Sequence, residues 1–308
     1  MNKSHKIAIV AGSALVLFAV IVVARYLYSE INRLKVGEPL VTIEKTATTT
    51  ATETTTSTAE EILIESTSTG PVEFKSPDDW TTFVLPEGTR LSNPFNFYGT
   101  TTAFENSISW RLLDENGVQI SFGFTQVNSP DIGIPGPFTV EAFFDTVPAT
   151  KKGKLQIYEA SAEDGEPIHV AEADVSFPNE TQITKVFFGN TDKATEGEEC
   201  ETVYPVERMT VKGDALQIAI HELLKGPNLL EANSGYYTSI PESVPHPEIL
   251  YKDEGTRLDF TQALQNQVGG SCRVLHIRKQ IQETFKEASS DESVTISIDG
   301  RTDDILQP

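Results

Sequence analysis

His221 and Glu222 begin a stretch, HELLK, with the spacing of the first half of a zinc-binding protease helix. Such a helix binds zinc through two imidazoles at positions i and i+4, and its glutamate acts as the general base. Lys225 occupies the i+4 position here. Because the second imidazole is missing, the stretch predicts no zinc site, and we interpret it as structural rather than catalytic.

The chain has two cysteines, Cys200 and Cys272. If this region lies outside the membrane, in an oxidising compartment, a disulfide between them is the favoured interpretation. Two alternatives stay open: a pair of buried thiols, or a catalytic Cys272 whose pKa is lowered near a helix N-terminus. A catalytic cysteine also needs a positioned histidine, and His276 lies one helical turn further on.

Two acidic stretches, 299–304 and 114–117, have the composition of loose calcium sites. Neither has the alternating ligand spacing of an EF-hand loop, so turn formation explains both better. The sequence also lacks the GxSxG elbow, the phosphate-binding P-loop and the dinucleotide fingerprint. It therefore predicts no catalytic residue, no cofactor and no metal site, and a protein that is not an enzyme.

The charge balance excludes one class of partner. The chain has 45 acidic and 24 basic residues, for a net charge of −21. Phosphate backbones are bound by clustered lysine and arginine, and no basic stripe is present. We therefore expect no nucleic-acid partner, and we interpret the acidity mainly as a source of solubility.

The elements that position these residues begin with an apolar run at 7–24, about 27 Å long as a helix. Aromatic residues at 26–28 suit a membrane interface, so we predict a single transmembrane helix over 7–28 after a cytoplasmic tail, 1–6. A cleaved signal peptide is the alternative, but the run is long and Arg25 is a poor residue just after a cleavage site. The later domains would then be extracytoplasmic, on the outer side of the cell membrane.

Residues 29–75 are predicted to be a disordered stalk. The stretch 46–70 consists mainly of Thr, Ser, Ala and Glu. Such a composition buries too little apolar surface to offset the conformational entropy of the chain.

From 76 to 178 the pattern has a period of two. Alternating apolar residues occur in three runs, each of which predicts a strand with one buried face: Ile108, Trp110, Leu112; Val118, Ile120, Phe122, Phe124; Ala171, Ala173, Val175, Phe177. Asn-Gly at 116–117 and Asp-Gly at 164–165 predict hairpin turns, because such turns need positive φ. Short strands with turns between them favour an all-β sandwich.

From 179 to 308 the pattern is mixed. It predicts strands at 183–188, 249–251, 258–260 and 294–298, and two helices. Asp214 is expected to cap the first helix, which ends at Gly226-Pro227, and Ser271 the second. The order β-α-β-β-α-β predicts an α+β domain of the split β-α-β type, with the helices on one face of a small sheet.

Short sequence motifs in both segments resemble those of known families. HELLKGP at 221, GYYTSIP at 235, TRLDF at 256 and GSCRVLHIRKQIQETF at 270 resemble the sporulation and spore germination domain, GerMN. NPFNFYG at 93, AFENSISWRLLDENG at 103 and GKLQIYEASAEDGEP at 153 resemble the immunoglobulin-like domain of bacterial spore germination. The resemblance implies a non-enzymatic role in envelope assemblies, with GerMN similar to ring-building modules that self-associate.

The GerMN resemblance also implies that the loop at 236–241 is characteristic of that family. Tyr236, Tyr237, Ile240 and Pro241 form a candidate interaction loop, because aromatic loop residues often carry binding energy. The alternative is that Tyr236 and Ile240 pack beneath the loop as a plug.

Together these features predict a membrane-anchored, extracytoplasmic envelope protein that acts as a scaffold or interaction module. Its expected partners are other envelope proteins, or a second copy through the GerMN domain. The alternative is a protein that binds a wall polymer such as peptidoglycan. Solvent-exposed aromatic side chains that line a groove would support this alternative, because sugars stack on aromatic rings.

Overall fold

The computed structural model describes residues 70–307, apart from 104–105, 132, 196, 198–199, 254, 290 and 292. The predicted cytoplasmic tail, transmembrane helix and most of the predicted stalk lie outside the described residues. Within that part of the chain, no helix is both long enough and apolar enough to span a membrane.

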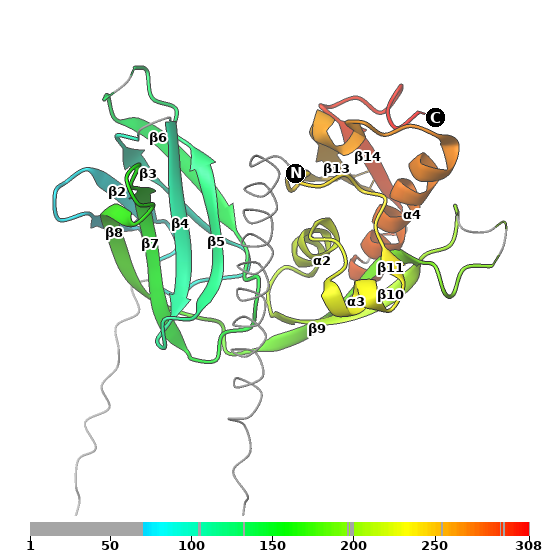
Figure 1. Cartoon of the computed structure of the whole chain (residues 1–308), viewed down its shortest axis with the longest axis horizontal. Helices are drawn as coiled ribbons and strands as arrows, with labels where there is room; N and C mark the ends of the chain where they lie inside the picture. Colours follow the sequence, from blue (N-terminus) through cyan, green and yellow to red (C-terminus); the bar gives the residue numbers. More distant parts are fainter. Residues whose placement is uncertain are drawn as a thin grey trace, which may run out of the picture. The chain divides into compact units, whose positions relative to one another are not determined.

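The N-terminal domain consists of two antiparallel sheets of four strands each (Figure 1). The first sheet has the order β1-β2-β3-β6, with these bounds: β1 Val72–Lys75, β2 Thr81–Leu85, β3 Phe95–Thr101 and β6 Gly136–Ala142. The second has the order β5-β4-β7-β8: β4 Ser107–Asp114, β5 Gln119–Gln126, β7 Lys152–Ala160 and β8 Pro167–Ser176. Gly117 and Gly165 have φ of 76° and 78°, as the two hairpin predictions required.

The core of this domain is rich in aromatic side chains. Phe97 is completely buried, and its ring lies edge-on to Phe83, Trp110 and Phe138 at centroid distances of 6.3, 5.7 and 6.5 Å. The predicted inward residues of β4 and β8 are buried as expected, with Leu112 at 0 % exposure. The alternating pattern was therefore a correct guide for these two strands.

The prediction was wrong for β5. Ile120 is buried, but Phe122 and Phe124 are 65 % and 76 % exposed, and Ser121 points inward in their place. The pairing of β4 with β5 shifts register between Leu112 and Leu113, which reverses the faces of the residues that follow. The inward position opposite Trp110 is Gly123, where an added Cβ would lie 2.9 Å from the indole ring.

The C-terminal domain contains two three-stranded sheets and two principal helices. One sheet, β10-β9-β11, consists of β9 Thr181–Asn190, β10 Tyr204–Val211 and β11 Tyr236–Tyr237. The other, β12-β13-β14, consists of β12 Glu248–Lys252, β13 Gly255–Phe260 and β14 Val294–Ile298. The helical segments are α2 Ala215–Leu224, α3 Leu229–Asn233, the short 3-10 helix η2 Gln262–Gln265 and α4 Ser271–Ala288.

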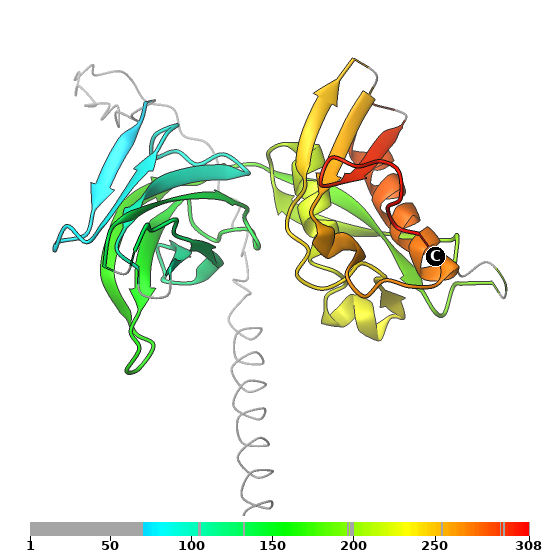
Figure 2. The same cartoon turned by 90° about the horizontal axis from the view of Figure 1, so that it is seen from above.

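Helix α4 lies between β13 and β14 in the chain, and these two strands pair in parallel with each other (Figure 2, orange helix and red strand). Its residues Val274, Ile277, Ile281 and Phe285 are all buried, as the helical spacing predicted. Three of the predicted strands lie in one sheet and the strand at 183–188 lies in the other. The domain also has a strand, β10, that the sequence prediction omitted.

The two helix starts differ from each other. Asp214 caps α2 as predicted, with its side chain accepting a hydrogen bond from the Gln217 N–H at 2.9 Å. The cap of α4 is Gly270, with φ of 86°, and Ser271 is the first helical residue. The prediction that Ser271 caps α4 was therefore one residue out, because a glycine supplies the required positive φ.

Candidate interaction surfaces of the C-terminal domain

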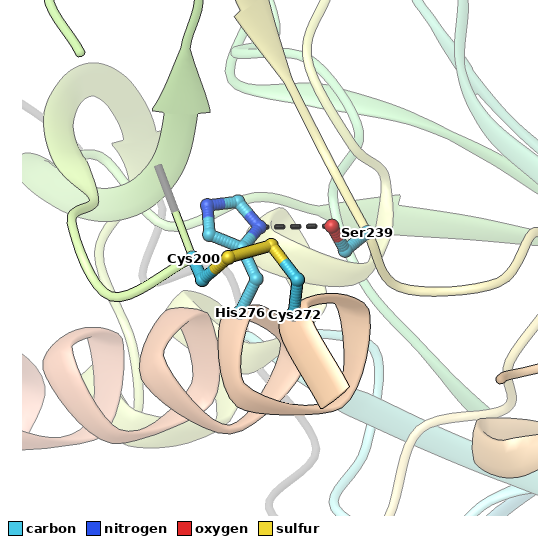
Figure 3. The surroundings of a disulfide bond; sticks show 4 residues. All are labelled: Cys200, Ser239, Cys272 and His276. Carbon is cyan, nitrogen blue, oxygen red and sulfur yellow. Dashed lines mark hydrogen bonds between the residues drawn. A yellow bond between two sulfur atoms is a disulfide. The ribbon is translucent and has the colours of Figure 1, made fainter. Parts of the chain in front are cut away.

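Cys200 and Cys272 are joined by a disulfide, with a Cα–Cα distance of 4.7 Å (Figure 3). The bond connects the loop before β10 to the first turn of α4, across a sequence separation of 72 residues. This is the interpretation that the sequence favoured among three. Because both sulfurs are bonded, the structure offers no thiolate for the catalytic alternative.

His276 lies beside the disulfide, and its surroundings are those of a structural residue. Its Nδ1 is 2.8 Å from the Ser239 hydroxyl (Figure 3). Its ring stacks on Tyr237 with a centroid distance of 5.2 Å. Burial lowers the pKa of the imidazole, and the nearby Thr202 backbone opposes that effect in part. Its Nε2 is buried and has no hydrogen-bond partner among the described residues. A neutral imidazole is therefore favoured.

A glycine on β9 permits this packing. A Cβ added at Gly189 would lie 2.4 Å from the Tyr237 ring and 2.6 Å from His276. Gly189 pairs with Tyr237 across the β9–β11 ladder, so the two rings stack against bare backbone. Any larger residue at this position would displace one of the rings.

Gln280, one turn further along α4, fixes the segment that follows β11. Its side chain is completely buried. Its Oε1 accepts a hydrogen bond from the Ser239 N–H at 3.0 Å, and its Nε2 donates to the Phe187 carbonyl at 3.3 Å. Gln280 thus ties the loop to β9, the central strand of its sheet, and helix α4 holds the loop in place.

The predicted interaction loop is therefore mostly packed. Tyr236 and Tyr237 form strand β11 and are half-buried, and Ile240 is a core residue at 5 % exposure. Pro241 is half-buried. The Tyr236 hydroxyl accepts a hydrogen bond from the Lys193 ammonium at 2.6 Å. This arrangement matches the plug alternative for Ile240, and it leaves the two tyrosines half-buried.

Beside this loop is an open depression of about 680 Å³. Its lining comes from the loop and from the start of α4: Tyr237, Ser239, Gly269, Gly270, Ser271, Cys272, Arg273 and His276. The Arg273 guanidinium is already engaged, because its Nε donates to the Ser239 carbonyl at 3.2 Å and its Nη1 to the Gln267 carbonyl at 3.0 Å. The depression is thus lined by side chains that hold the loop in place.

A second surface, which the sequence prediction missed, is the short helix α3. Leu229 and Leu230 are 81 % and 80 % exposed there. Asn228 and Glu231 form a reciprocal capping box at its start, which fixes the helix despite its length. A Leu-Leu pair directly after an Asn cap, with Glu at the third helical position, was the available signal.

Arg208, on β10, fixes the position of α3. Its guanidinium makes ion pairs with Glu231 at 2.6 Å and Glu222 at 3.0 Å, and donates to the Gly226 carbonyl at 2.7 Å. Both carboxylates are largely buried, so these charge-assisted hydrogen bonds are strong. Glu222, the glutamate of the HELLK stretch, is thus a structural residue that fixes the α2–α3 connection.

The outer face of the β9–β10 ladder adds a third exposed apolar pair. Ile183 and Met209 lie opposite each other and are 58 % and 65 % exposed.

The acidic stretch at 114–117, in the N-terminal domain, forms a turn, in which the Asp114 carboxylate accepts hydrogen bonds from the Asn116 and Val118 N–H groups. Among the described residues, no cluster of His, Cys, Asp and Glu side chains has the arrangement of a metal site.

Comparisons with known proteins agree with this architecture. Residues 185–304 match the family model described as sporulation and spore germination, and residues 86–166 match the immunoglobulin-like domain of bacterial spore germination. Neither description names a reaction. No curated protein matches the chain.

Two solved structures illustrate the similarity. The tandem GerMN domains of the sporulation protein GerM from Bacillus subtilis are 24 % identical, with a TM-score of 0.32, over 45 % of this chain and 50 % of that one. The first GerMN domain of the same protein is 14 % identical, with a TM-score of 0.29, over 39 % of this chain and 85 % of that one. The chain thus spans about half the length of the tandem structure. In this chain, a segment that matches the sporulation and spore germination family model thus follows a segment that matches the immunoglobulin-like domain of bacterial spore germination.

Proposed function

We propose that this chain is a membrane-anchored scaffold of the bacterial envelope that binds other envelope proteins through its C-terminal domain. Two adjacent domains of germination families support the setting. The apolar run at 7–24 supports the anchor, and the folded, acidic domains that follow it support an orientation that places both of them outside the membrane. The role is one of assembly rather than catalysis.

The observation that carries the proposal is the pair Leu229 and Leu230. Large apolar side chains that are about four-fifths exposed are costly to display in water, and a contact that buries them would be favourable. The pair is also preorganised, because the capping box and Arg208 fix α3 before any partner arrives. Preorganisation lowers the entropy lost on binding. A rigid apolar knob is therefore the part of this domain best suited to dock in a partner's groove.

The test is crosslinking in intact cells that express the full chain. An amine-reactive crosslinker should yield complexes of higher mass, and the double substitution Leu229→Gln, Leu230→Gln should remove most of them. Leu275→Gln is the matched control, because Leu275 is 43 % exposed on α4, in the same domain. Complexes with other proteins that persist in the double variant, or their loss in the control, would refute the role of α3; a homodimer of the chain does not count in this comparison.

The anchor and its orientation have a separate test. The full chain should stay with the membrane fraction in high salt and dissolve only in detergent. Protease added outside wall-stripped cells should digest both domains. Release by salt alone, or full protection from external protease, would contradict the membrane-anchored arrangement.

Binding to a wall polymer is the alternative function. One cavity of the N-terminal domain, about 780 Å³, is lined by charged and aliphatic residues without an aromatic ring on which a sugar could stack. Saturable pelleting of the full chain with peptidoglycan sacculi, resistant to moderate salt, would nevertheless establish it. No pelleting would leave protein binding as the function.

A further inference from the structure

Strand β5 forms a free edge of the N-terminal sandwich, since it is the terminal strand in the order β5-β4-β7-β8 (Figure 1). A free edge displays unpaired peptide groups that can pair with another strand. Protective devices such as an edge lysine or proline are absent from Gln119–Gln126, which contains no charged residue. This edge is thus open to pairing, unlike the edges that proteins usually guard.

The hydrogen bonds show which peptide groups face outward. The Val127 N–H donates to the Asn106 carbonyl at 2.8 Å, next to the paired strands β4 and β5. Because orientation alternates along an antiparallel strand, the odd-numbered residues of this stretch face β4 and the even-numbered ones face away from it. The N–H and C=O groups of Phe122 and Phe124 therefore point to the free side.

Both ends of this edge are closed, and its middle is open. The Thr146 hydroxyl donates to the Ile120 carbonyl at 3.4 Å, and the Asn128 N–H donates to the Pro137 carbonyl at 2.9 Å. Between them, within the described part of the chain, the main chain of β5 pairs with β4 alone, and the Thr125 hydroxyl donates to the Thr139 carbonyl of β6 at 3.3 Å. The open stretch is thus centred on Gly123, with Phe122 and Phe124 on either side.

The sequence of this stretch is nearly palindromic. It reads Ser-Phe-Gly-Phe-Thr from 121 to 125, with Gly123 at the centre. Two copies related by a twofold axis need a surface that is complementary to itself. Antiparallel pairing about Gly123 would place Phe122 opposite Phe124 of a second copy, twice, with outward-facing peptide groups matched. Four hydrogen bonds and a cluster of four phenyl rings would result.

Charge and area are consistent with such a partner. The chain carries a net charge of −21, so two copies repel wherever carboxylates meet. On this face, the charge next to Phe122 is Arg111 of β4, and no carboxylate lies on β5. The four rings would bury roughly 550 Å² at about 200 Å² per phenylalanine, below the 1,200–2,000 Å² of a stable interface. The area fits a transient dimer.

We infer that the N-terminal domain self-associates through the β5 edge, with Gly123 on the twofold axis, as a weak homodimer. This contact is independent of the proposed role of α3, which lies in the other domain. It would give the chain two binding surfaces, one for a second copy and one for a partner.

The register can be tested by disulfide trapping with the full chain in mild detergent, because the native cysteines are already bonded to each other. A mixture of Phe122→Cys and Phe124→Cys chains should form a crosslinked dimer under mild oxidation. Residues directly opposite each other lie about 5.5 Å apart, within disulfide range. Either variant alone should crosslink weakly, since its cysteines would be diagonal, at about 7–8 Å. Equal crosslinking in all three samples, or none, would overturn the inference.

A second measurement keeps the inference falsifiable if trapping disturbs the edge. Phe124→Lys should raise the dissociation constant of the dimer at least about tenfold in sedimentation velocity. Met209→Lys, at a strand residue of similar exposure in the other domain, should leave it unchanged. A monomer up to the millimolar range, equal effects of both substitutions, or Phe124-dependent pelleting with sacculi in place of a dimer would each refute self-association.

Discussion

The two domains solve the problem of a stable interior in different ways. The N-terminal sandwich relies on aromatic packing, with Phe97 surrounded by four rings and no covalent link. The C-terminal domain has a largely aliphatic core, a disulfide and buried polar residues such as Gln280 and His276. Their exposed apolar residues differ as well: Phe122 and Phe124 lie on an edge strand of the sandwich, whereas Leu229 and Leu230 lie on a helix held by ion pairs.

Both tryptophans of the chain, Trp80 and Trp110, lie in the N-terminal domain, whereas α2 and α4 lie in the C-terminal domain. Tryptophan fluorescence therefore reports on the sandwich, and the circular dichroism change at 222 nm reports mainly on the other domain. Each change below should move one signal and leave the other in place. A change that moved both signals together would show that the domains unfold as one unit.

The largest effect is expected for Phe97→Ala. Deleting a buried phenyl ring costs about 3–5 kcal/mol of unfolding free energy, because transfer and cavity terms add. The fluorescence transition in a urea titration should shift strongly while the 222 nm transition stays in place. Phe124→Ala, which removes a ring that is 76 % exposed, should shift neither by more than about 0.5 kcal/mol.

Replacing both cysteines, Cys200→Ser with Cys272→Ser, should have nearly as large an effect on the other domain. The closed loop spans 72 residues, and the chain-entropy relation gives about 4 kcal/mol as an upper value. The 222 nm transition should move to lower urea, and the fluorescence transition should remain. Adding a reductant to the double variant should not move the 222 nm transition any further. A further shift would mean that the reductant acts on something other than the disulfide.

Gln280→Ala should destabilise the C-terminal domain by about 1–3 kcal/mol, since it removes a buried side chain and leaves the half-buried Ser239 N–H without its acceptor. Gln282→Ala is the matched control on the same helix, because Gln282 is exposed. Urea titrations followed at 222 nm would compare the two. Equal effects would show that helix propensity, rather than the buried hydrogen bonds, accounts for the loss.

The smallest effect concerns pH. Burial lowers the pKa of His276 in the folded protein below its ordinary value of 6.5, so the unfolded chain binds more protons as the pH falls. Stability of the C-terminal domain is therefore full above about pH 6.5 and declines as the pH decreases below it. His276→Gln should reduce this decline without abolishing it, because burial also lowers the pKa of His246. A slope unchanged in this variant would contradict a buried, neutral His276.

Much of the architecture was predictable from local patterns. The strands β4, β8 and β14 and the apolar face of α4 followed from spacing alone, because side chains alternate in strands and recur every three or four residues in helices. The Asp214 cap and the glycines at 117 and 165 followed from backbone chemistry. Short sequence motifs in the two segments indicated two families, and the models of both families match the chain.

The amino-acid sequence by itself determined the type of the elements that it predicted, although that prediction lacked β10 and α3. It also predicted the two-domain division and offered one pair of cysteines that could bond. Only the tertiary structure decided which apolar residues stay in water. Phe122 and Phe124 are exposed because a register shift in the β4–β5 pairing and the bulk of Trp110 exclude them from the core. Leu229 and Leu230 are exposed because Arg208, twenty-three residues before Glu231, holds α3 with that face outward. Register and long-range ion pairs depend on partners distant in sequence, and no local pattern records them.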